Sequence, residues 1–229
     1  YSDISKQFDY TYGGTGIQPK FPQPMTYEFL LRYHLNSKDS QALNMVNLTL
    51  EKMAFGGIYD QLGGGFHRYS TDILWLVPHF EKMLYDNALL AQLYLHAYQA
   101  TGKSLYKRII QEILDYVVRE MTDTSGGFYS SQDADSEGVE GKYFLWRPEE
   151  IVQILGKEDG GIINQYFDVT LRGNFEGHSI LNLAHDTDQE NQKPSLDERN
   201  LEDLINRSKI KLLEARQKRI KPNRDEKIL

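Results

Sequence analysis

Two histidines and several charged residues lie close together in one short segment, GGGFHRYSTDILWLVPHFEKMLYDN. Imidazole titrates near neutral pH, so His67 and His79 could form an acid and base pair if both faced one cavity. Arg68, Asp72 and Glu81 are near enough in the sequence to hold a polar substrate beside them. A purely structural role is the alternative, because the proline before His79 could begin a helix whose first turn favours an acidic residue. Of the two functional roles, we favour substrate binding over direct catalysis.

The acidic segment SQDADSEG supplies a second set of candidate groups. Asp133 or Asp135 could serve as the general acid or base of a glycosidase, with Asp60 or Asp86 as the second carboxylate. The same residues could instead only shape the turn by hydrogen bonding to the backbone. The EF-hand calcium pattern does not fit, because its twelfth position falls on Phe144, where a bidentate glutamate is required. A looser cation site in this segment is a minor alternative, and the leading expectation is no metal and no cofactor.

Aromatic residues are frequent in and beside the glycine-rich motifs. An aromatic face next to polar groups suits a sugar ring, whose C–H face is apolar and whose hydroxyls need hydrogen-bond partners. Aromatic side chains also cap helical cores, and we expect core packing for about half of them. The residues concerned are Phe66, Tyr69, Trp75, Phe128, Tyr129, Tyr143 and Trp146.

The composition excludes several classes of protein. The 229 residues are 40% hydrophobic and 12% aromatic, which is enough to bury a core. The net charge of −7 argues against a general nucleic-acid binder, and the basic residues from Arg216 to Arg224 are expected to be a solvated helix end. The absence of cysteine excludes thiol catalysis and disulfides. No apolar run reaches the roughly 18 residues of a membrane span.

Helical periodicity dominates the sequence. It predicts helices over 24–35, 40–55, 78–100, 103–121 and 148–155. Two strand-like runs within 126–146 predict a β-hairpin, and the polar residues 185–200 predict an insertion before a last amphipathic helix from Leu201.

A weak internal repeat places a glycine-aromatic motif after each pair of helices, at FGGIYDQ, GGFHRYSTD and GGFYSSQDADS. Such units stack side by side because a single helical hairpin cannot bury its apolar face alone. The sequence therefore predicts an all-α fold, an (α/α)6 toroid of helical hairpins with small β-hairpins in the glycine-rich loops. The loops would gather at one end of the toroid and form the mouth of its cavity.

Several long motifs carry a resemblance to a known family. They are FDYTYGGTGIQPKFPQP, GGIYDQLGGGFHRYSTD with WLVPHFEKMLYDNALL, GGFYSSQDADSEGVEGKYFLW and the final DEKIL. With them the chain resembles the thioredoxin-domain-containing family of spermatogenesis-associated protein 20. The resemblance implies a thioredoxin-like domain upstream, followed by a toroid akin to six-hairpin glycosidases and N-acylglucosamine 2-epimerases. On this basis residues 1–23 are expected to be an extended segment after that domain, and residues 24–229 a partial toroid.

The leading hypothesis is therefore a carbohydrate-binding or carbohydrate-processing domain, similar to an epimerase or a glycosidase. Its catalytic candidates are His67, His79, Asp133 and Asp135. Its substrate-binding candidates are Arg68, Tyr69, Asp72, Trp75, Glu81, Asp86, Tyr129 and Trp146. The alternative is a non-catalytic docking domain that serves the upstream thioredoxin unit.

Different partners and different surfaces follow from these two hypotheses. The expected partners are a small sugar and the thioredoxin-like domain, with neither nucleic acid nor membrane, and the expected location is the cytoplasm. An enzyme should have a polar cavity with carboxylates or histidines within reach of one small molecule. A docking domain should have that region filled and an exposed apolar patch elsewhere.

Overall fold

A computed structural model of the chain describes residues 1–183 and 198–228. Most of the predicted insertion at 185–200 lies outside the described residues. The helices are α1 (Ser2–Gln7), α2 (Pro24–Ser37), α3 (Ser40–Phe55), α4 (Leu84–Thr101), α5 (Ser104–Tyr116), α6 (Pro148–Leu155), α7 (Lys157–Tyr166) and α8 (Glu198–Arg216), and a π-helical turn over Val117–Met121 extends α5. In this part of the chain no helix is both long and apolar enough to cross a membrane.

The helix ends follow the local signals in the sequence. Proline is the first residue of α2, where its missing N–H costs nothing. The side chain of Asp39 caps α3 by accepting a hydrogen bond from the backbone N–H of Gln41 at 2.8 Å. Helix α4 ends at Gly102, which takes the left-handed conformation with φ of 72°. The predicted helices 24–35 and 40–55 are confirmed.

The predicted helix over 78–100 is wrong at its start, because α4 begins only at Leu84. The preceding residues are extended and form β2 (Pro78–His79) and β3 (Lys82–Met83). Strand β2 pairs with β1 (Tyr69–Ser70), and β3 pairs with β4 (Tyr129–Gln132). Backbone pairing with the nearby β1 and the distant β4 thus outweighs the local helical periodicity of this stretch.

The β-hairpin predicted over 126–146 is also replaced by a different pairing. Strand β4 lies between β3 and β7 (Arg224–Ile228) in a three-stranded antiparallel sheet. The hairpin in this region is smaller and joins β5 (Asp135–Ser136) to β6 (Val139–Glu140). The second strand-like run ends at Trp146, whose backbone bridges to Ser179 instead.

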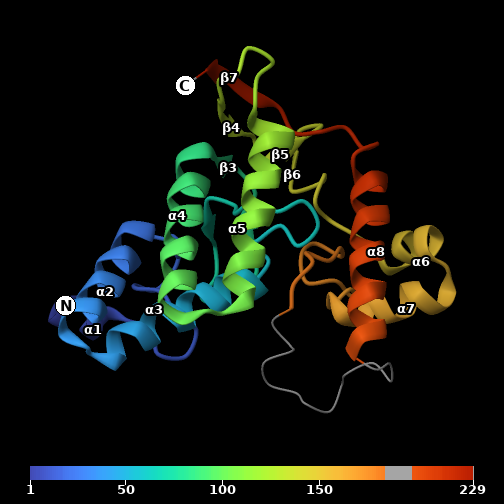
Figure 1. Cartoon of the computed structure of the whole chain (residues 1–229). Helices are drawn as coiled ribbons and strands as arrows, with labels where there is room; N and C mark the ends of the chain where they lie inside the picture. Colours follow the sequence, from blue (N-terminus) through green and yellow to red (C-terminus); the bar gives the residue numbers. More distant parts are fainter. Residues whose placement is uncertain (184–197, 229) are drawn as a thin grey trace.

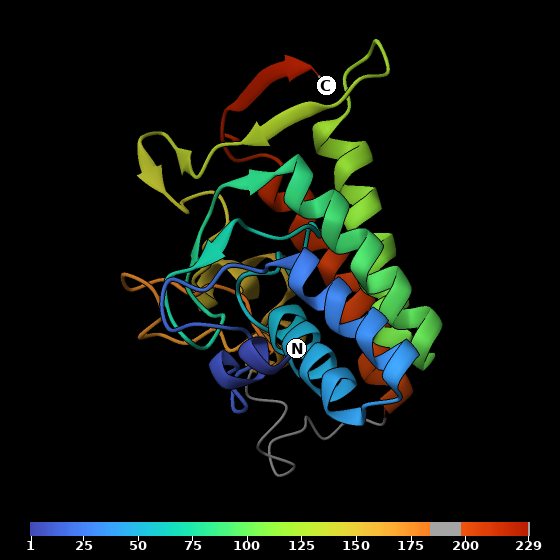
Figure 2. The same ribbon diagram turned by 90° about the vertical axis from the view of Figure 1, so that its left-hand side faces the viewer.

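Helices α2, α4, α5 and α8 stand side by side in a row, with α6 and α7 beyond α8 (Figure 1). Helices α2 to α5 share one apolar core, and α6 to α8 share another. A third cluster, which includes Phe80 and Phe144, lies in the loops. Figure 2 shows the strands and loops gathered along one side of this row of helices. The loops that carry the glycine-rich motifs therefore lie on this side of the helices.

The leading segment 1–23 packs against the body of the protein rather than remaining extended throughout. Its first part forms α1. Lys20 is buried, and its ammonium donates to the carboxylate of Asp9 at 2.6 Å and to the carbonyl of Ile73 at 3.0 Å. The segment is therefore joined to the loop that precedes β2.

Candidate functional site

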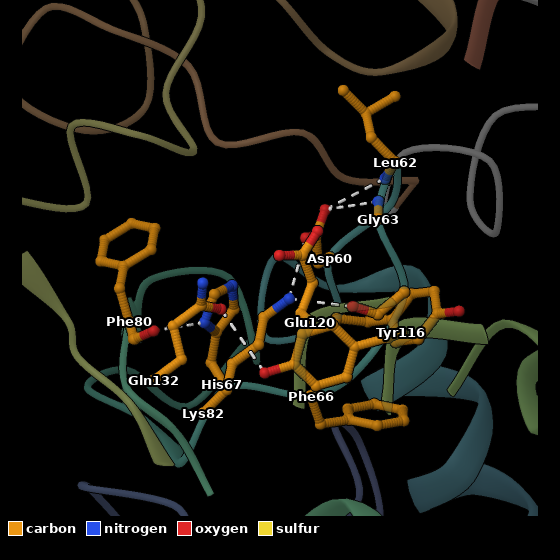
Figure 3. Close-up of polar contacts among 12 residues, drawn as sticks. Asp60, Leu62, Gly63, Phe66, His67, Phe80, Lys82, Tyr116, Glu120 and Gln132 are labelled. Carbon is orange, nitrogen blue, oxygen red and sulfur yellow. Dashed lines mark hydrogen bonds and ion pairs between the residues drawn. The ribbon is translucent and has the colours of Figure 1, made fainter. Parts of the chain in front are cut away.

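A buried polar network centres on Asp60, in the loop that follows α3 (Figure 3). Its carboxylate accepts a hydrogen bond from the ammonium of Lys82 at 2.8 Å and two from the guanidinium of Arg216, each at 2.8 Å. The backbone N–H groups of Leu62 and Gly63 also donate to it, at 3.1 and 3.0 Å. Every oxygen of this buried carboxylate is therefore satisfied, as the cost of burying a charge requires.

The charges in this network shift one another's protonation. Arg216 and Lys82 hold the pKa of Asp60 well below its usual range even though burial alone would raise it. Burial lowers the pKa of Lys82 to about 8, although Asp60 opposes that change. The expectation that Arg216 belongs to a solvated helix end is wrong, since its side chain is buried and reaches from the last turn of α8 to Asp60.

His67 lies beside this network and is enclosed. Its Nδ1 makes a 2.8 Å hydrogen bond with the carbonyl of Phe80, and the rings of Phe80 and Phe144 pack edge-on against it. Burial lowers the pKa of His67 to about 3, and the nearby Lys82 adds to the decrease. The adjoining cavity measures about 10 Å³, which holds no more than one water molecule. His67 is therefore neutral at ordinary pH and has no room for a sugar beside it.

A second, more open cluster forms where β1 pairs with β2. The guanidinium of Arg68 donates to the Glu81 carboxylate at 2.6 Å. The Nε2 atom of His79 lies 3.9 Å from the same carboxylate, and its Nδ1 lies 2.7 Å from the carboxylate of Glu140. Tyr69 stacks on the His79 ring with centroids 5.0 Å apart. The structure thus brings together four of the candidate residues and adds Glu140, which the sequence did not single out.

Asp86 joins this cluster from the first turn of α4. Its side chain is half-buried and makes no hydrogen bond or ion pair with a described residue. Burial raises the pKa of Asp86 to about 6, and the Glu81 carboxylate adds to the increase while Arg68 opposes it. The neighbouring Tyr85 is 50% exposed. An unpartnered carboxyl group that titrates near neutral pH can both donate and accept a proton.

Three other carboxylate candidates lie in turns or on the short strand β5. Asp133 and Asp135 are exposed, and Asp133 accepts a hydrogen bond from the next backbone N–H at 2.8 Å. Within the described residues neither carboxylate contacts His67 or His79. Asp72 accepts from the backbone N–H groups of residues 74, 76 and 77, which shapes the turn between β1 and β2. These contacts match the turn-forming alternative, and the catalytic role of Asp133 and Asp135 stays a prediction.

The aromatic candidates divide between core and surface, as expected. Trp75 is fully buried, and its indole N–H donates to the carbonyl of Tyr12 at 2.9 Å. Trp146 is fully buried beneath the guanidinium of Arg219, 4.1 Å from the ring centroid. Tyr129 donates its hydroxyl to Asp123 on the β4 side of the molecule. Core packing is thus the role of Trp75 and Trp146 in this structure.

The residues that sequence reasoning missed are charged partners distant in the chain. Lys82 falls within the helix predicted over 78–100, and Glu140 within the β-hairpin predicted over 126–146. Two sequence signals were available. One is the glycines around Asp60. The other is the alternation of residues in HFEKM (79–83), because on a strand the side chain of Lys82 faces the same side as that of Phe80. Among the described residues, no group of three or more His, Asp or Glu side chains is placed to hold a metal ion.

Comparison with known proteins identifies the family. The chain is 36% identical to human spermatogenesis-associated protein 20 over 258 aligned residues, covering 100% of the chain and 33% of the human protein. The chain belongs to the family of spermatogenesis-associated protein 20. The rat member is also 36% identical, and an uncharacterised protein of Caenorhabditis elegans is 38% identical over 76% of the chain. The chain spans about a third of the length of its curated mammalian relatives. No family model matches it.

Solved structures establish the fold of this member of the spermatogenesis-associated protein 20 family. Cellobiose 2-epimerase from Spirochaeta thermophila superposes with a TM-score of 0.51 at 19% identity, over 58% of the chain and 36% of the epimerase. A sugar epimerase from a ruminal bacterium gives a TM-score of 0.52 at 13% identity, over 73% of the chain and 51% of the epimerase. The predicted toroid-type fold is confirmed. Identity this low establishes the fold alone.

Proposed function

We propose that this domain binds a carbohydrate and transfers a proton to or from it at the cluster of Arg68, His79, Glu81 and Asp86. The observation that carries the proposal is the half-buried carboxyl group of Asp86, which has no partner among the described residues and a pKa raised to about 6. A carboxyl group in this state is suited to general acid and base work near neutral pH. The toroid fold shared with two sugar epimerases supports a carbohydrate as the ligand, by fold analogy.

The other members of the cluster have complementary roles in this proposal. The ion pair of Arg68 with Glu81 holds a guanidinium at the edge of the site, where its remaining N–H groups can bind sugar hydroxyls. His79 is fixed by Glu140 and places an imidazole ring in the cluster. Tyr85 presents an exposed ring beside Asp86, which suits the apolar face of a sugar.

The experiment measures binding and turnover on one panel of monosaccharides, amino sugars and short oligosaccharides. Calorimetry detects binding, incorporation of deuterium from solvent detects epimerisation, and release of reducing ends detects hydrolysis. Asp86→Asn should reduce turnover at least about 100-fold, the usual contribution of a positioned acid or base. Asp115→Asn makes the same isosteric change at an exposed site on α5 and should leave turnover unchanged.

Two results would contradict the proposal. One is the absence of binding for every sugar in the panel. The other is turnover within twofold of wild type in Asp86→Asn. The pH profile gives a further check, because activity that needs the ionised carboxylate should rise as pH increases through about 6.

A docking domain is the second candidate, and a specific observation favours it. The space around His67 is filled, and α2 exposes the apolar side chains of Met25 (64%) and Phe29 (45%) one helical turn apart. On this hypothesis a separately produced thioredoxin-like domain should bind the chain in calorimetry, and Phe29→Glu should abolish that binding. Loss of turnover in Asp86→Asn, together with unchanged binding of the thioredoxin-like domain by Phe29→Glu, would exclude docking through this face of α2 as the main function.

A further inference from the structure

A cavity of about 750 Å³ lies next to the proposed site and has no role assigned so far. Its walls come from the β5–β6 hairpin, the segment leading into α6, the loop around His178 and the residues just after α8. This volume falls within the range of small-molecule pockets, about 300–1,000 Å³. Val139, Leu145 and Ile220 supply apolar wall surface among a larger number of charged side chains. The cavity can therefore hold a ligand of the size of one or two sugar rings.

The cavity wall carries four cationic side chains and four carboxylates, but not all of them are paired with one another. Lys142 pairs with Glu137 at 2.7 Å, and Arg219 pairs with Glu150 at 3.2 Å. Glu140 is held by His79 at 2.7 Å. After these contacts, two cationic side chains of the wall have no carboxylate partner among the described residues, and one carboxylate of the wall has no cationic or histidine partner among them. The cations are Arg147 and Lys218, and the carboxylate is Glu176.

The side chain of Arg147 is oriented by a specific contact. Its Nε–H donates to the Nε2 atom of His178 at 3.1 Å, so that imidazole nitrogen acts as an acceptor. The Nδ1 atom of the same ring lies 3.2 Å from the carbonyl oxygen of Glu176, as a neutral ring that donates there would. The two terminal nitrogens of Arg147 make no hydrogen bond to a described residue. A guanidinium edge of this kind matches a carboxylate or a phosphate with two parallel hydrogen bonds.

The cavity and the proposed catalytic cluster share one residue. Glu140 lines the cavity, and its carboxylate is also bonded to His79, which stacks on Tyr69 in the cluster. A ligand in the cavity that contacts Glu140 would therefore be separated from His79 by this one side chain.

We propose that this cavity binds the anionic group of an acidic sugar, a carboxylate or a phosphate, through Arg147 and Lys218. The inference rests on the proposed function for the sugar and on the cavity's own unpaired cations for the negative charge. Val139 and Ile220 would face the apolar side of the ring.

The test compares glucuronate, glucose 6-phosphate and glucose by calorimetry with the complete chain. Wild type should bind at least one of the two acidic sugars at least tenfold more tightly than glucose. The double variant Arg147→Gln/Lys218→Gln should lose at least tenfold of that affinity. Arg207→Gln/Lys211→Gln removes the same charge from the exposed side of α8 and should bind as wild type does. Circular dichroism and the unfolding midpoint establish that each variant is folded.

The two acidic sugars separate the possible sources of the anion, since preference for glucuronate assigns a carboxylate and preference for glucose 6-phosphate assigns a phosphate. Equal binding of glucose and both acidic sugars, or undiminished affinity in the Arg147→Gln/Lys218→Gln variant, overturns the inference. The Asp86→Asn variant separates this failure from that of the proposed function. Acidic-sugar binding without turnover in wild type leaves the cavity assignment standing and removes the catalytic role. Turnover of neutral sugars that depends on Asp86, without tighter binding of acidic sugars, supports the catalytic role and removes the cavity assignment.

Discussion

Replacing Asp60 with asparagine should be among the most destabilising single changes in the chain. The substitution keeps the shape of the side chain but removes the charge that Lys82 and Arg216 both contact at 2.8 Å. Both cationic side chains are buried, with 1% and 3% of their surface exposed. They cannot turn to solvent without opening the loop after α3, so the variant leaves Arg216 and Lys82 buried without their counter-charge, and Lys82 keeps its proton only at an energetic cost.

The expected size follows from the cost of breaking a buried ion pair. Removing one partner of such a pair costs about 3–5 kcal/mol, because the remaining charge stays desolvated and unpaired. With a urea dependence of about 3 kcal/mol per M, that loss lowers the unfolding midpoint by about 1–1.7 M. Asp159→Asn removes a carboxylate from an exposed pair with Arg207 and should cost less than about 0.5 kcal/mol.

Urea unfolding followed by circular dichroism measures both changes. The double variant Asp60→Asn/Arg216→Met adds a sharper test, because it removes one of the two uncompensated charges. Its loss of stability should be smaller than the sum of the two single losses, with a coupling above about 1 kcal/mol. A loss below about 1 kcal/mol for Asp60→Asn, or strictly additive losses, would refute the network as the element that holds α8 to the Asp60 loop.

Two further predictions concern pH and backbone conformation. The pKa of His67 falls from 6.5 in the unfolded chain to about 3 in the folded protein, so below pH 6.5 only the unfolded state takes up this proton. As the pH decreases from 6.5 to roughly 3, this residue should therefore lower the free energy of unfolding by about 1.4 kcal/mol per pH unit. If His67→Gln shows the same dependence of unfolding free energy on pH as wild type, the lowered pKa of His67 is contradicted. Gly64→Ala should lower the melting temperature much more than Gly126→Ala, although both glycines have positive φ. A Cβ atom at Gly64 would lie 2.2 Å from the carbonyl oxygen of Glu112, whereas at Gly126 it would meet no atom within 4 Å. Equal melting temperatures for the two glycine variants would show that the contact with α5 does not matter.

The sequence alone determined the features that depend on neighbours along the chain. The helix pair of α2 and α3 could be predicted because a proline, an aspartate cap and a regular apolar stripe lie within each segment. The toroid-type fold followed from the repetition of helical hairpins and from the family resemblance. The sequence also singled out Arg68, Tyr69, His79 and Glu81 as candidates because they lie within one short segment, and the structure places their side chains in contact with one another.

Only the tertiary structure decided which of these candidates share a site. Residues 78–83 have helical periodicity but are extended, because their backbone groups pair with β1 and β4. Asp60 and Arg216 are 156 residues apart in the sequence, and no local pattern signals their contact. The pKa values of the candidate residues also depend on the tertiary structure. His67 and Asp86 are both titratable residues of the segment 63–87, yet enclosure makes His67 neutral while half-burial raises the pKa of Asp86 to about 6. Desolvation depends on what the fold packs around a group, and the residue's place in the sequence does not contain that information.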